Sequence, residues 1–313
     1  MTDPADPIAD LAQDLQGVHT RLLDLVGPHR ADLFAHCRRL TGSLWDAEDL
    51  LQDTLLRLLS AYARSWQEPP PLRPLLFRIA TRAWIDRWRR RQAEGFGDDG
   101  PEPAAAPGPD PVEVGEAAER LFQVLPPRER AAVALVDALG LDAAEAAACI
   151  GSTPGAVRVA LHRGRLRLRS APPPPAVEAP AIPAVVHAFC AAFARRDLAG
   201  CTACLLDDAE SEVVGCVQEF GRAAIAAGSL AHTLAEPDDP QAVPAIIDGE
   251  PVVLIHYRTA AGPALGDVVR VRIADGAIAG LHHHFFCPEL LAAVAAGLGG
   301  AVRGNGWRYG APG

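Results

Sequence analysis

The chain has 313 residues and a formal net charge of −10, with 39 acidic residues against 29 basic ones, all of them Arg. This balance excludes a uniformly basic coat protein for nucleic acid, but it leaves room for local basic patches. No segment has the roughly 20 apolar residues of a membrane span, and the acidic start MTDPADPIAD is unlike a signal peptide. We expect a cytoplasmic protein with no membrane partner, whose seven scattered cysteines are reduced thiols.

The charge is distributed in segments that suggest three domains. The net charge is +1 over residues 1–92, −6 over 93–115, +2 over 116–170 and −7 over 171–313. Two stretches have the composition of linkers: an acidic Pro- and Gly-rich one and a short proline-rich one. The predicted division is therefore a domain at 19–92, a linker at 93–117, a domain at 118–170, a linker at 171–180, and a domain at 181–313.

The first domain is predicted to be all-α. Apolar residues recur with a helical period over 22–33 and 51–62, and Thr41-Gly42-Ser43 separates these two helices. Acidic residues open the second helix, where they suit the positive end of its dipole. A proline-rich loop at 66–74 leads into a third helix at 75–91.

The second domain is also predicted to be helical. Pro126-Pro127 opens a helix at 128–139, and a short helix at 142–150 ends at Gly151. Ser152 or Thr153 then caps a further helix, at 153–169, with Pro154 in its first turn. Two helices joined by a tight turn containing glycine are typical of a helix-turn-helix.

The third domain changes character. Helices are predicted at 182–194 and 198–206, strands at 252–257, 268–273 and 278–286, and a closing helix at 288–298. This pattern indicates an α+β fold with an antiparallel sheet.

Two helices concentrate positive charge. Residues 73–91 hold seven Arg and one Asp, and Trp84 and Trp88 are four residues apart. Arginines neutralise phosphates and aromatic rings support unstacked bases, but a solvated basic face over two core tryptophans fits equally well. The helix at 153–169 offers Arg158, Val159, His162 and Arg163 where a recognition helix meets base edges, which favours DNA binding over a basic helix that caps a bundle.

These motifs resemble a known family. DAEDLLQDTLLRLL (46–59) and LLFRIATRAWIDRWRRR (75–91) resemble region 2 of sigma-70 family RNA polymerase sigma factors of the extracytoplasmic-function (ECF) group. The segment 125–169, from LPPRER to LRLR, resembles region 4 of the same family. The resemblance implies two partners, the RNA polymerase core enzyme and promoter DNA.

The resemblance also implies roles for individual residues. The expected contacts with core polymerase are Asp46, Glu48, Asp49, Gln52 and Asp53. The expected contacts with the minus-ten element are Trp66, Arg73, Arg78, Arg82, Trp84, Arg87, Trp88, Arg89, Arg90 and Arg91. The expected contacts with the minus-thirty-five element are Thr153, Arg158, Val159, His162, Arg163 and Arg165. Arg82, Trp84, Val159 and Ala160 depart from the family pattern, so the promoter sequence does not transfer from relatives.

The third domain resembles the SnoaL-like domains, through residues 189–210, 221–227 and the late strands. This resemblance implies a cone-shaped α+β barrel that regulates sigma activity. His282, His283 and His284 are candidate pocket residues, with Asp267 and Arg270 as further polar groups. An enzyme is the alternative, although a vestigial cone or one that binds a small ligand is favoured because no acid–base pair follows from the spacing.

The pair Cys201 and Cys204 has a metal-ligand spacing, but a second such pair is missing, and the two also suit a helix core. We expect no metal, no cofactor and no catalytic residues. The sequence therefore predicts a sigma factor tuned by its third domain, through an intramolecular contact or a small ligand. The alternatives are a DNA-binding leader fused to an enzyme or ligand sensor, and a simple helix-turn-helix repressor.

Overall fold

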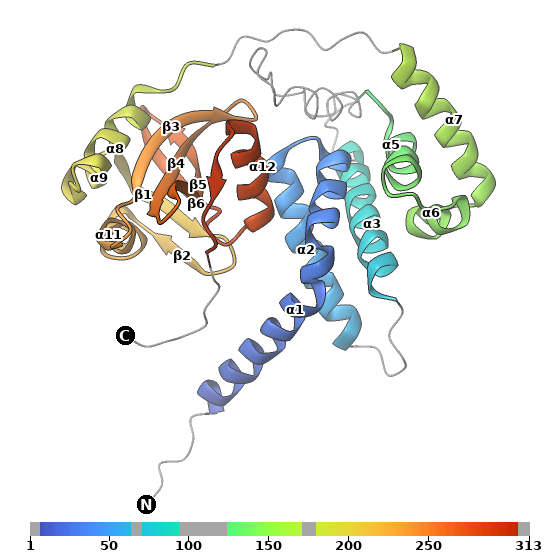
Figure 1. Ribbon diagram of the computed structural model, residues 1–313, viewed down its shortest axis with the longest axis horizontal. Helices are drawn as coiled ribbons and strands as arrows, with labels where there is room; N and C mark the ends of the chain where they lie inside the picture. Colours follow the sequence, from blue (N-terminus) through green and yellow to red (C-terminus); the bar gives the residue numbers. More distant parts are fainter. Residues whose placement is uncertain (1–6, 64–70, 94–123, 171–179, 306–313) are drawn as a thin grey trace, which may run out of the picture. The chain divides into compact units, whose positions relative to one another are not determined.

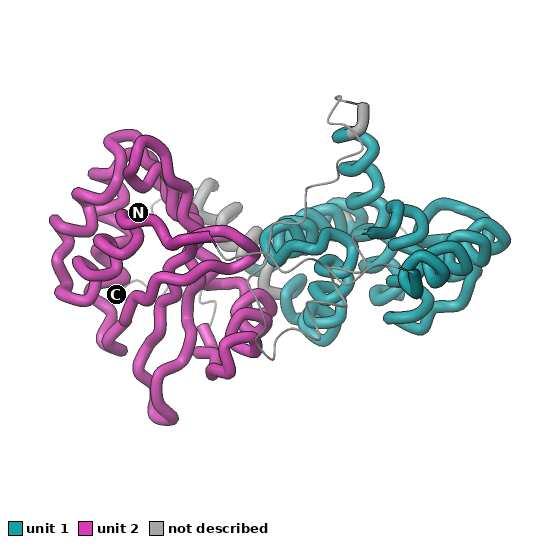
Figure 2. Tube along the Cα trace, turned by 90° about the horizontal axis from the view of Figure 1, so that it is seen from above, with its two compact units in different colours: residues 1–99, 118–173, 308–313 teal, residues 100–117, 174–307 magenta. Residues whose placement is uncertain are grey.

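The computed structural model describes residues 7–63, 71–93, 124–170 and 180–305, which fall into two compact units (Figures 1 and 2). The helical unit holds the first three of these ranges, and the C-terminal unit holds residues 180–305. No described helix is both long enough and apolar enough to cross a membrane.

Three long helices open the helical unit: α1 (Pro7–Thr41), α2 (Leu44–Ala63) and α3 (Leu72–Ala93). They pack through fully buried residues such as Leu33, Leu50 and Phe77. The chain breaks between α1 and α2 at the predicted place, because Gly42 takes a positive φ of 78° and the Ser43 hydroxyl accepts from the amides of Trp45 and Asp46.

The second half of the helical unit is a helix-turn-helix with a preceding helix. Its elements are α5 (Pro127–Val133), the π-helical turn η1 (Ala134–Ala138), α6 (Ala143–Ile150) and α7 (Pro154–Ser170). Asp142 and Glu145 form a reciprocal capping box at the start of α6, and Gly151 ends that helix with a φ of 73°. Thr153 caps α7, since its hydroxyl accepts from the amide of Ala156 at 3.2 Å.

In the C-terminal unit, helices pack against a curved sheet. The helices are α8 (Ala184–Ala194), α9 (Leu198–Ala203), α10 (Arg222–Ala227), α11 (Ser229–Ala235) and α12 (Pro288–Leu298). The strands are β1 (Leu205–Val213), β2 (Val217–Phe220), β3 (Gln241–Ile247), β4 (Glu250–Thr259), β5 (Gly262–Ala274), β6 (Ala277–His283) and β7 (Ala301–Val302). Figure 1 shows α8, α9 and α11 gathered at one side of the curved sheet.

Two expectations about this sheet are wrong. The strand order is β2-β1-β6-β5-β4-β3 with β7 beside β5, so β2 and β3 are the ends of an open sheet and the described strands do not close into a barrel. The sheet is also mixed rather than antiparallel, because β1 and β6 run parallel. Within it, the predicted strand at 278–286 ends at His283, and the predicted helix at 198–206 gives way to β1 at Leu205.

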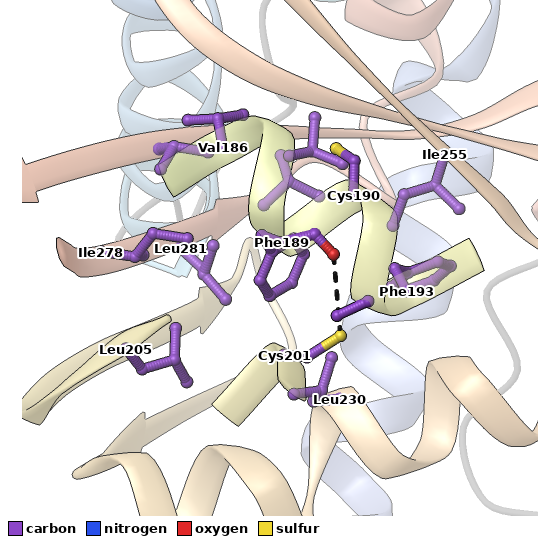
Figure 3. Close-up of a cluster of buried hydrophobic side chains, with 14 of the residues drawn as sticks. Val186, Phe189, Cys190, Phe193, Cys201, Leu205, Leu230, Ile255, Ile278 and Leu281 are labelled. Atoms are coloured by element: carbon purple, nitrogen blue, oxygen red, sulfur yellow. Dashed lines mark hydrogen bonds between the residues drawn. The ribbon is translucent and has the colours of Figure 1, made fainter. Parts of the chain in front are cut away.

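The core of the C-terminal unit lies between α8 and the sheet. Phe189 and Phe193 of α8 pack against Ile255, Ile278 and other apolar residues of the strands (Figure 3). The core residues alternate along β4, as Val253, Ile255 and Tyr257, and along β5, as Val269 and Val271, as the pleat of a strand requires. The predicted alternation in 268–273 is confirmed, with Val269 and Val271 in this core.

Arg303, which directly follows β7, links this segment to the rest of the C-terminal unit. Its guanidinium lies 4.1 Å from the centre of the Tyr257 ring and pairs with Asp238 at 2.8 Å. Tyr257 in turn lies against the backbone of Gly266, where an added Cβ would stand 2.4 Å from a ring carbon. Glycine at position 266 is therefore required by the close approach of the tyrosine ring rather than by its own backbone conformation.

Replacing Gly266 by Ala is expected to destabilise the C-terminal unit by about 2 kcal/mol, because the fully buried Tyr257 ring has nowhere to move. Hydrogen exchange of the β4 and β5 amides in the full chain measures this loss. Gly304→Ala is the matched control, since an added Cβ there meets nothing within 4 Å. Equal protection in the two variants would contradict the prediction.

Candidate functional site

Most, but not all, of the predicted core-polymerase contacts at the acidic start of α2 are accessible at the surface. Asp49 is exposed, and Asp46, Gln52 and Asp53 are partly exposed. Asp53 is held between Arg57 of the same helix, at 2.9 Å, and Arg87 of α3, at 3.2 Å.

Glu48 differs from the expectation of a surface contact, because it is only 1% exposed. Its carboxylate accepts a hydrogen bond from the Gln52 amide at 2.7 Å. Burial, followed by the Glu48 charge, raises the pKa of the Cys37 thiol on α1, which places this carboxylate against the interior. Glu48 directly precedes the exposed Asp49, yet its side chain serves the packing of the helix.

Helix α3 carries the first cationic surface. Arg82, Arg89, Arg90 and Arg91 are exposed, while Arg73, Arg78, Arg87 and Trp88 are partly exposed. Several of these arginines already have acidic partners: Arg73 approaches Asp32 at 3.7 Å and Arg89 approaches Asp86 at 3.7 Å. The candidate Trp66 lies outside the described residues.

Trp84 does not share an open face with Trp88. It is buried, and the guanidinium of Arg130 lies 5.5 Å from the centre of its ring. Arg130 belongs to α5, so the ring that was expected to support bases contacts the helix-turn-helix half of the same unit instead.

Arg130 and Arg82 join the two halves of the helical unit. Arg130 donates to the carbonyl of Leu40, in the last turn of α1, at 2.8 Å, and burial lowers its pKa to about 10. Arg82 of α3 donates to the carbonyl of Ala148, near the end of α6, at 3.0 Å. Each cation meets the carbonyl end of a helix, where the helix dipole is negative.

Helix α7 carries the second cationic surface. All six candidate residues on it are exposed, namely Thr153, Arg158, Val159, His162, Arg163 and Arg165. Val157 and Gly164 form the buried side, which packs against α5. Arg165 pairs with Asp137 through Nε at 3.0 Å, and Arg167 pairs with Glu129 at 3.0 Å, so these two arginines fasten α7 to its own domain.

The three consecutive histidines have three different environments. His282 is partly exposed and lies 3.2 Å from Glu212. His283 is buried and shares a hydrogen bond of 2.7 Å with Asp267. His284 is buried against the carbonyl of Val268 at 2.9 Å, and burial lowers its pKa to about 4.

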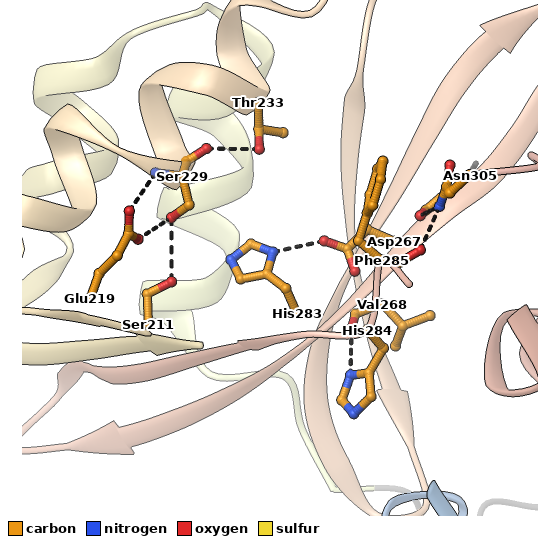
Figure 4. Close-up of polar contacts among 11 residues, drawn as sticks. Ser211, Glu219, Ser229, Thr233, Asp267, Val268, His283, His284, Phe285 and Asn305 are labelled. Atoms are coloured by element: carbon orange, nitrogen blue, oxygen red, sulfur yellow. Dashed lines mark hydrogen bonds and ion pairs between the residues drawn. The ribbon is translucent and has the colours of Figure 1, made fainter. Parts of the chain in front are cut away.

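His283 is the histidine that faces the interior of the curved sheet. Figure 4 shows its ring turned toward Ser211 and Ser229, while His284 points away. Ser229 is itself tied to Glu219, which accepts from both its amide and its hydroxyl. The cavity beside His283 measures only about 10 Å³, which is space for a single water molecule.

This arrangement places a carboxyl group within hydrogen-bond reach of a histidine in a largely apolar surrounding, and such a pair is capable of acid–base chemistry. Beside His283, however, Phe189, Phe193 and Leu281 leave only the small cavity of about 10 Å³, whereas a cavity of about 360 Å³ is lined by His282 and Arg270. Sequence reasoning named His283 and Asp267 separately but could not pair them. It missed Arg130, Asp137 and Glu129, whose partners lie on other helices.

Five of the seven cysteines are buried in the cores of the two units, whereas Cys204 is partly exposed and Cys216 is exposed. All seven are free thiols, and burial raises the pKa of Cys190 and of Cys201 to about 12. The Cys201 thiol contacts the carbonyl of Phe189 inside the core shown in Figure 3. Among the described residues no group of three or more His, Cys, Asp or Glu side chains could hold a metal ion.

Native protein at pH 8 is expected to react with iodoacetamide at the exposed Cys216, while Cys190 and Cys201 react only after unfolding. A thiol with a pKa of about 12 has roughly one thiolate in ten thousand at that pH, and it is buried as well. Peptide mass spectrometry locates the label, and Cys216→Ser should remove the rapid reaction. Rapid native labelling of Cys201 would instead favour a redox-active pair with Cys204.

Comparison with known proteins identifies the family to which the helical unit belongs. Residues 25–94 match the family model of sigma-70 region 2, and residues 115–168 match that of sigma-70 region 4. Two such regions in this order define a sigma-70 type factor. The chain belongs to the extracytoplasmic-function group of this family, the ECF RNA polymerase sigma factors.

The relatives differ in how much of each chain is shared. SigF of Caulobacter vibrioides is 34% identical over 136 residues, which cover 40% of this chain and 70% of SigF. SigG of Mycobacterium tuberculosis is 37% identical over 175 residues, and the chain spans about half of its length, 47%. The crystal structure of the ECF factor SigJ from Mycobacterium tuberculosis is similar over 81% of this chain and 92% of SigJ, with 22% identity and a TM-score of 0.33.

Proposed function

We propose that this protein directs RNA polymerase to promoters: it binds the core enzyme through α2 and promoter DNA through α3 and α7. The observation that carries the proposal is the exposure of all six candidate residues on α7, a helix that its own domain holds in place. A helix-turn-helix presents its second helix to the major groove, and exposed arginines supply the attraction to phosphates.

The polymerase contact is assigned to Asp46, Asp49, Gln52 and Asp53, without Glu48. In the minus-ten surface, Arg78, Trp88, Arg89, Arg90 and Arg91 are accessible in the closed helical unit. Arg82 and Trp84 contact region 4, and the use of the buried Trp84 on DNA requires the two regions to separate. The domain boundaries proposed from the sequence serve this function: region 2 at 19–92, region 4 at 118–170 and the C-terminal domain at 181–313.

The C-terminal domain is proposed to tune this activity without catalysis. The nearly filled space beside His283 supports a role without catalysis at the Asp267–His283 pair. The Asp267–His283 pair is the observation that favours the alternative, a ligand-binding or catalytic cone. If the C-terminal domain is regulatory, His283→Ala changes promoter output only by disturbing the folding of this domain, and no enzymatic activity is lost.

Run-off transcription with core polymerase and a library of genomic fragments tests the main proposal. The full chain is expected to yield promoter-specific transcripts, and an Arg158→Ala, Arg163→Ala double variant is expected to lose them. Arg195→Ala, an exposed arginine of the C-terminal unit, is the matched control. Absence of a specific transcript from any fragment would refute the function, and an unchanged output from a chain ending at residue 170 would refute the tuning.

A further inference from the structure

The outermost side of α7 is largely apolar, although the helix carries five arginines and the exposed His162 lies between Val159 and Leu166. Val159 is 51% exposed and Leu166 is 58% exposed. Gly155 lies one turn before Val159, and an added Cβ there would meet nothing within 4 Å. Because Val157 and Gly164 define the buried side, the helical period puts Gly155, Val159 and Leu166 on the opposite side.

Four of the five arginines fall into two groups. Arg165 and Arg167 pair with Asp137 and Glu129, which hold α7 against the rest of region 4. Arg158 and Arg163 are exposed, and they flank Val159 on either side of the apolar line. A duplex placed on this face would therefore meet cations at the edges of the contact and a small apolar strip at its centre.

The chemistry of the major groove limits what Val159 can contact. A valine side chain offers neither a donor nor an acceptor, so it cannot read the hydrogen-bonding edge of any base. The apolar group that bases present in this groove is the C5-methyl of thymine. Gly155 lets the start of the helix come close to the bases, in the part of a recognition helix that reads sequence.

We propose that Val159 is a specificity-determining residue, whose methyl groups pack on the C5-methyl of a thymine in the upstream promoter element while Arg158 and Arg163 bind the adjoining phosphates. The inference rests on the proposed promoter binding and adds to it the kind of base that this helix selects. The alternative partner for an exposed apolar line is another protein, and the experiment distinguishes a DNA contact from a protein contact.

The test uses the full chain with core polymerase and a duplex carrying an upstream element selected from a random library. Each thymine of the element is replaced in turn by deoxyuridine, which removes only the methyl group. At one position the replacement is expected to weaken binding about fourfold, the effect of one buried methyl group. Val159→Ala should bind the parent duplex with a similar loss and should no longer respond to deoxyuridine at that position.

Two comparisons complete the experiment. Arg163→Ala should weaken binding to all sequences alike and reduce the salt dependence, because it removes a phosphate contact. Val159→Thr keeps the shape of the side chain with one methyl group fewer, and it should retain part of the thymine preference. Circular dichroism verifies that each variant keeps its helices, which an exposed position allows.

The inference fails if no thymine responds to loss of its methyl group, or if the response persists in Val159→Ala. It also fails if Val159→Ala binds DNA normally but loses affinity for core polymerase, which would make the apolar line a protein contact. If the wild-type protein selects no element at all, the proposed promoter binding itself fails, and this outcome is distinct from the others.

Discussion

Replacing Arg130 by Met is expected to shift the helical unit toward a state in which regions 2 and 4 are separated. The substitution removes hydrogen bonds from a charged donor to the carbonyls of Leu40 and Leu125, as well as the cation–π contact with Trp84. Charged hydrogen bonds of this kind contribute about 1.5–3 kcal/mol and the ring contact about 1 kcal/mol. A loss of about 3 kcal/mol corresponds to a change of roughly 100-fold in the ratio of closed to open forms.

Hydrogen exchange in the full chain measures this shift. The amides of α6 should exchange up to about 100-fold faster in Arg130→Met, because α6 packs against α3 in the closed form. Arg130→Lys should fall between the two, since an ammonium group keeps the charge but not the planar stacking on Trp84. Arg128→Met is the control, because Arg128 is exposed on the same helix.

The same variant should bind single-stranded promoter DNA more tightly in the absence of polymerase. In the closed unit, Trp84 is buried under Arg130 and is withheld from a nucleic-acid partner, while the exposed Arg82 is engaged by the carbonyl of Ala148. Fluorescence anisotropy with a labelled minus-ten strand tests this expectation. Unchanged affinity together with accelerated exchange would show that Arg82 and Trp84 take no part in binding the strand.

Replacing Gly164 by Val is expected to destabilise region 4 by about 2–3 kcal/mol. Gly164 is the point where α7 crosses α5, and an added Cβ would stand 2.8 Å from a methyl carbon of Val133 and 3.4 Å from the carbonyl oxygen of Glu129. Valine adds two further methyl groups to a space that is already closed. Overpacking of this kind forces the helices apart, and it also strains the ion pair between Arg167 and Glu129.

Gly155→Val is the matched control for this substitution. It makes the same change in the same helix at a position where nothing lies within 4 Å of the added Cβ. Urea denaturation of the full chain, followed by hydrogen exchange in α5 and α7, compares the two variants with the wild type. Similar stability of the two variants would show that α5 and α7 do not pack closely at Gly164.

The local features of the helical unit were predictable because neighbouring residues determine them. The break at Gly42, the end of α6 at Gly151 and the cap before Pro154 each follow from the preference of one or two residues for a particular backbone or hydrogen bond. Apolar periodicity likewise identified the helices, although α1 extends well beyond the predicted 22–33 and continues through Pro28.

The contacts between distant segments were not predictable. Arg130 and Leu40 are 90 positions apart, and no pattern in either segment indicates the other. Periodicity showed that Trp84 and Trp88 are near each other on one helix, but it could not tell which ring a second helix would cover. The parallel pairing of β1 with β6 is a similar case, because β1 contains four acidic residues and has little apolar alternation of its own.

The open sheet has a consequence for the behaviour of the C-terminal unit in concentrated solution. An unclosed sheet offers unpaired backbone groups at both margins, where a strand of another molecule could add. Here the β3 margin carries Pro244, which has no amide hydrogen to donate, and the β2 margin is only four residues long. The domain can therefore keep its sheet open while offering little template for strand-by-strand association with other chains.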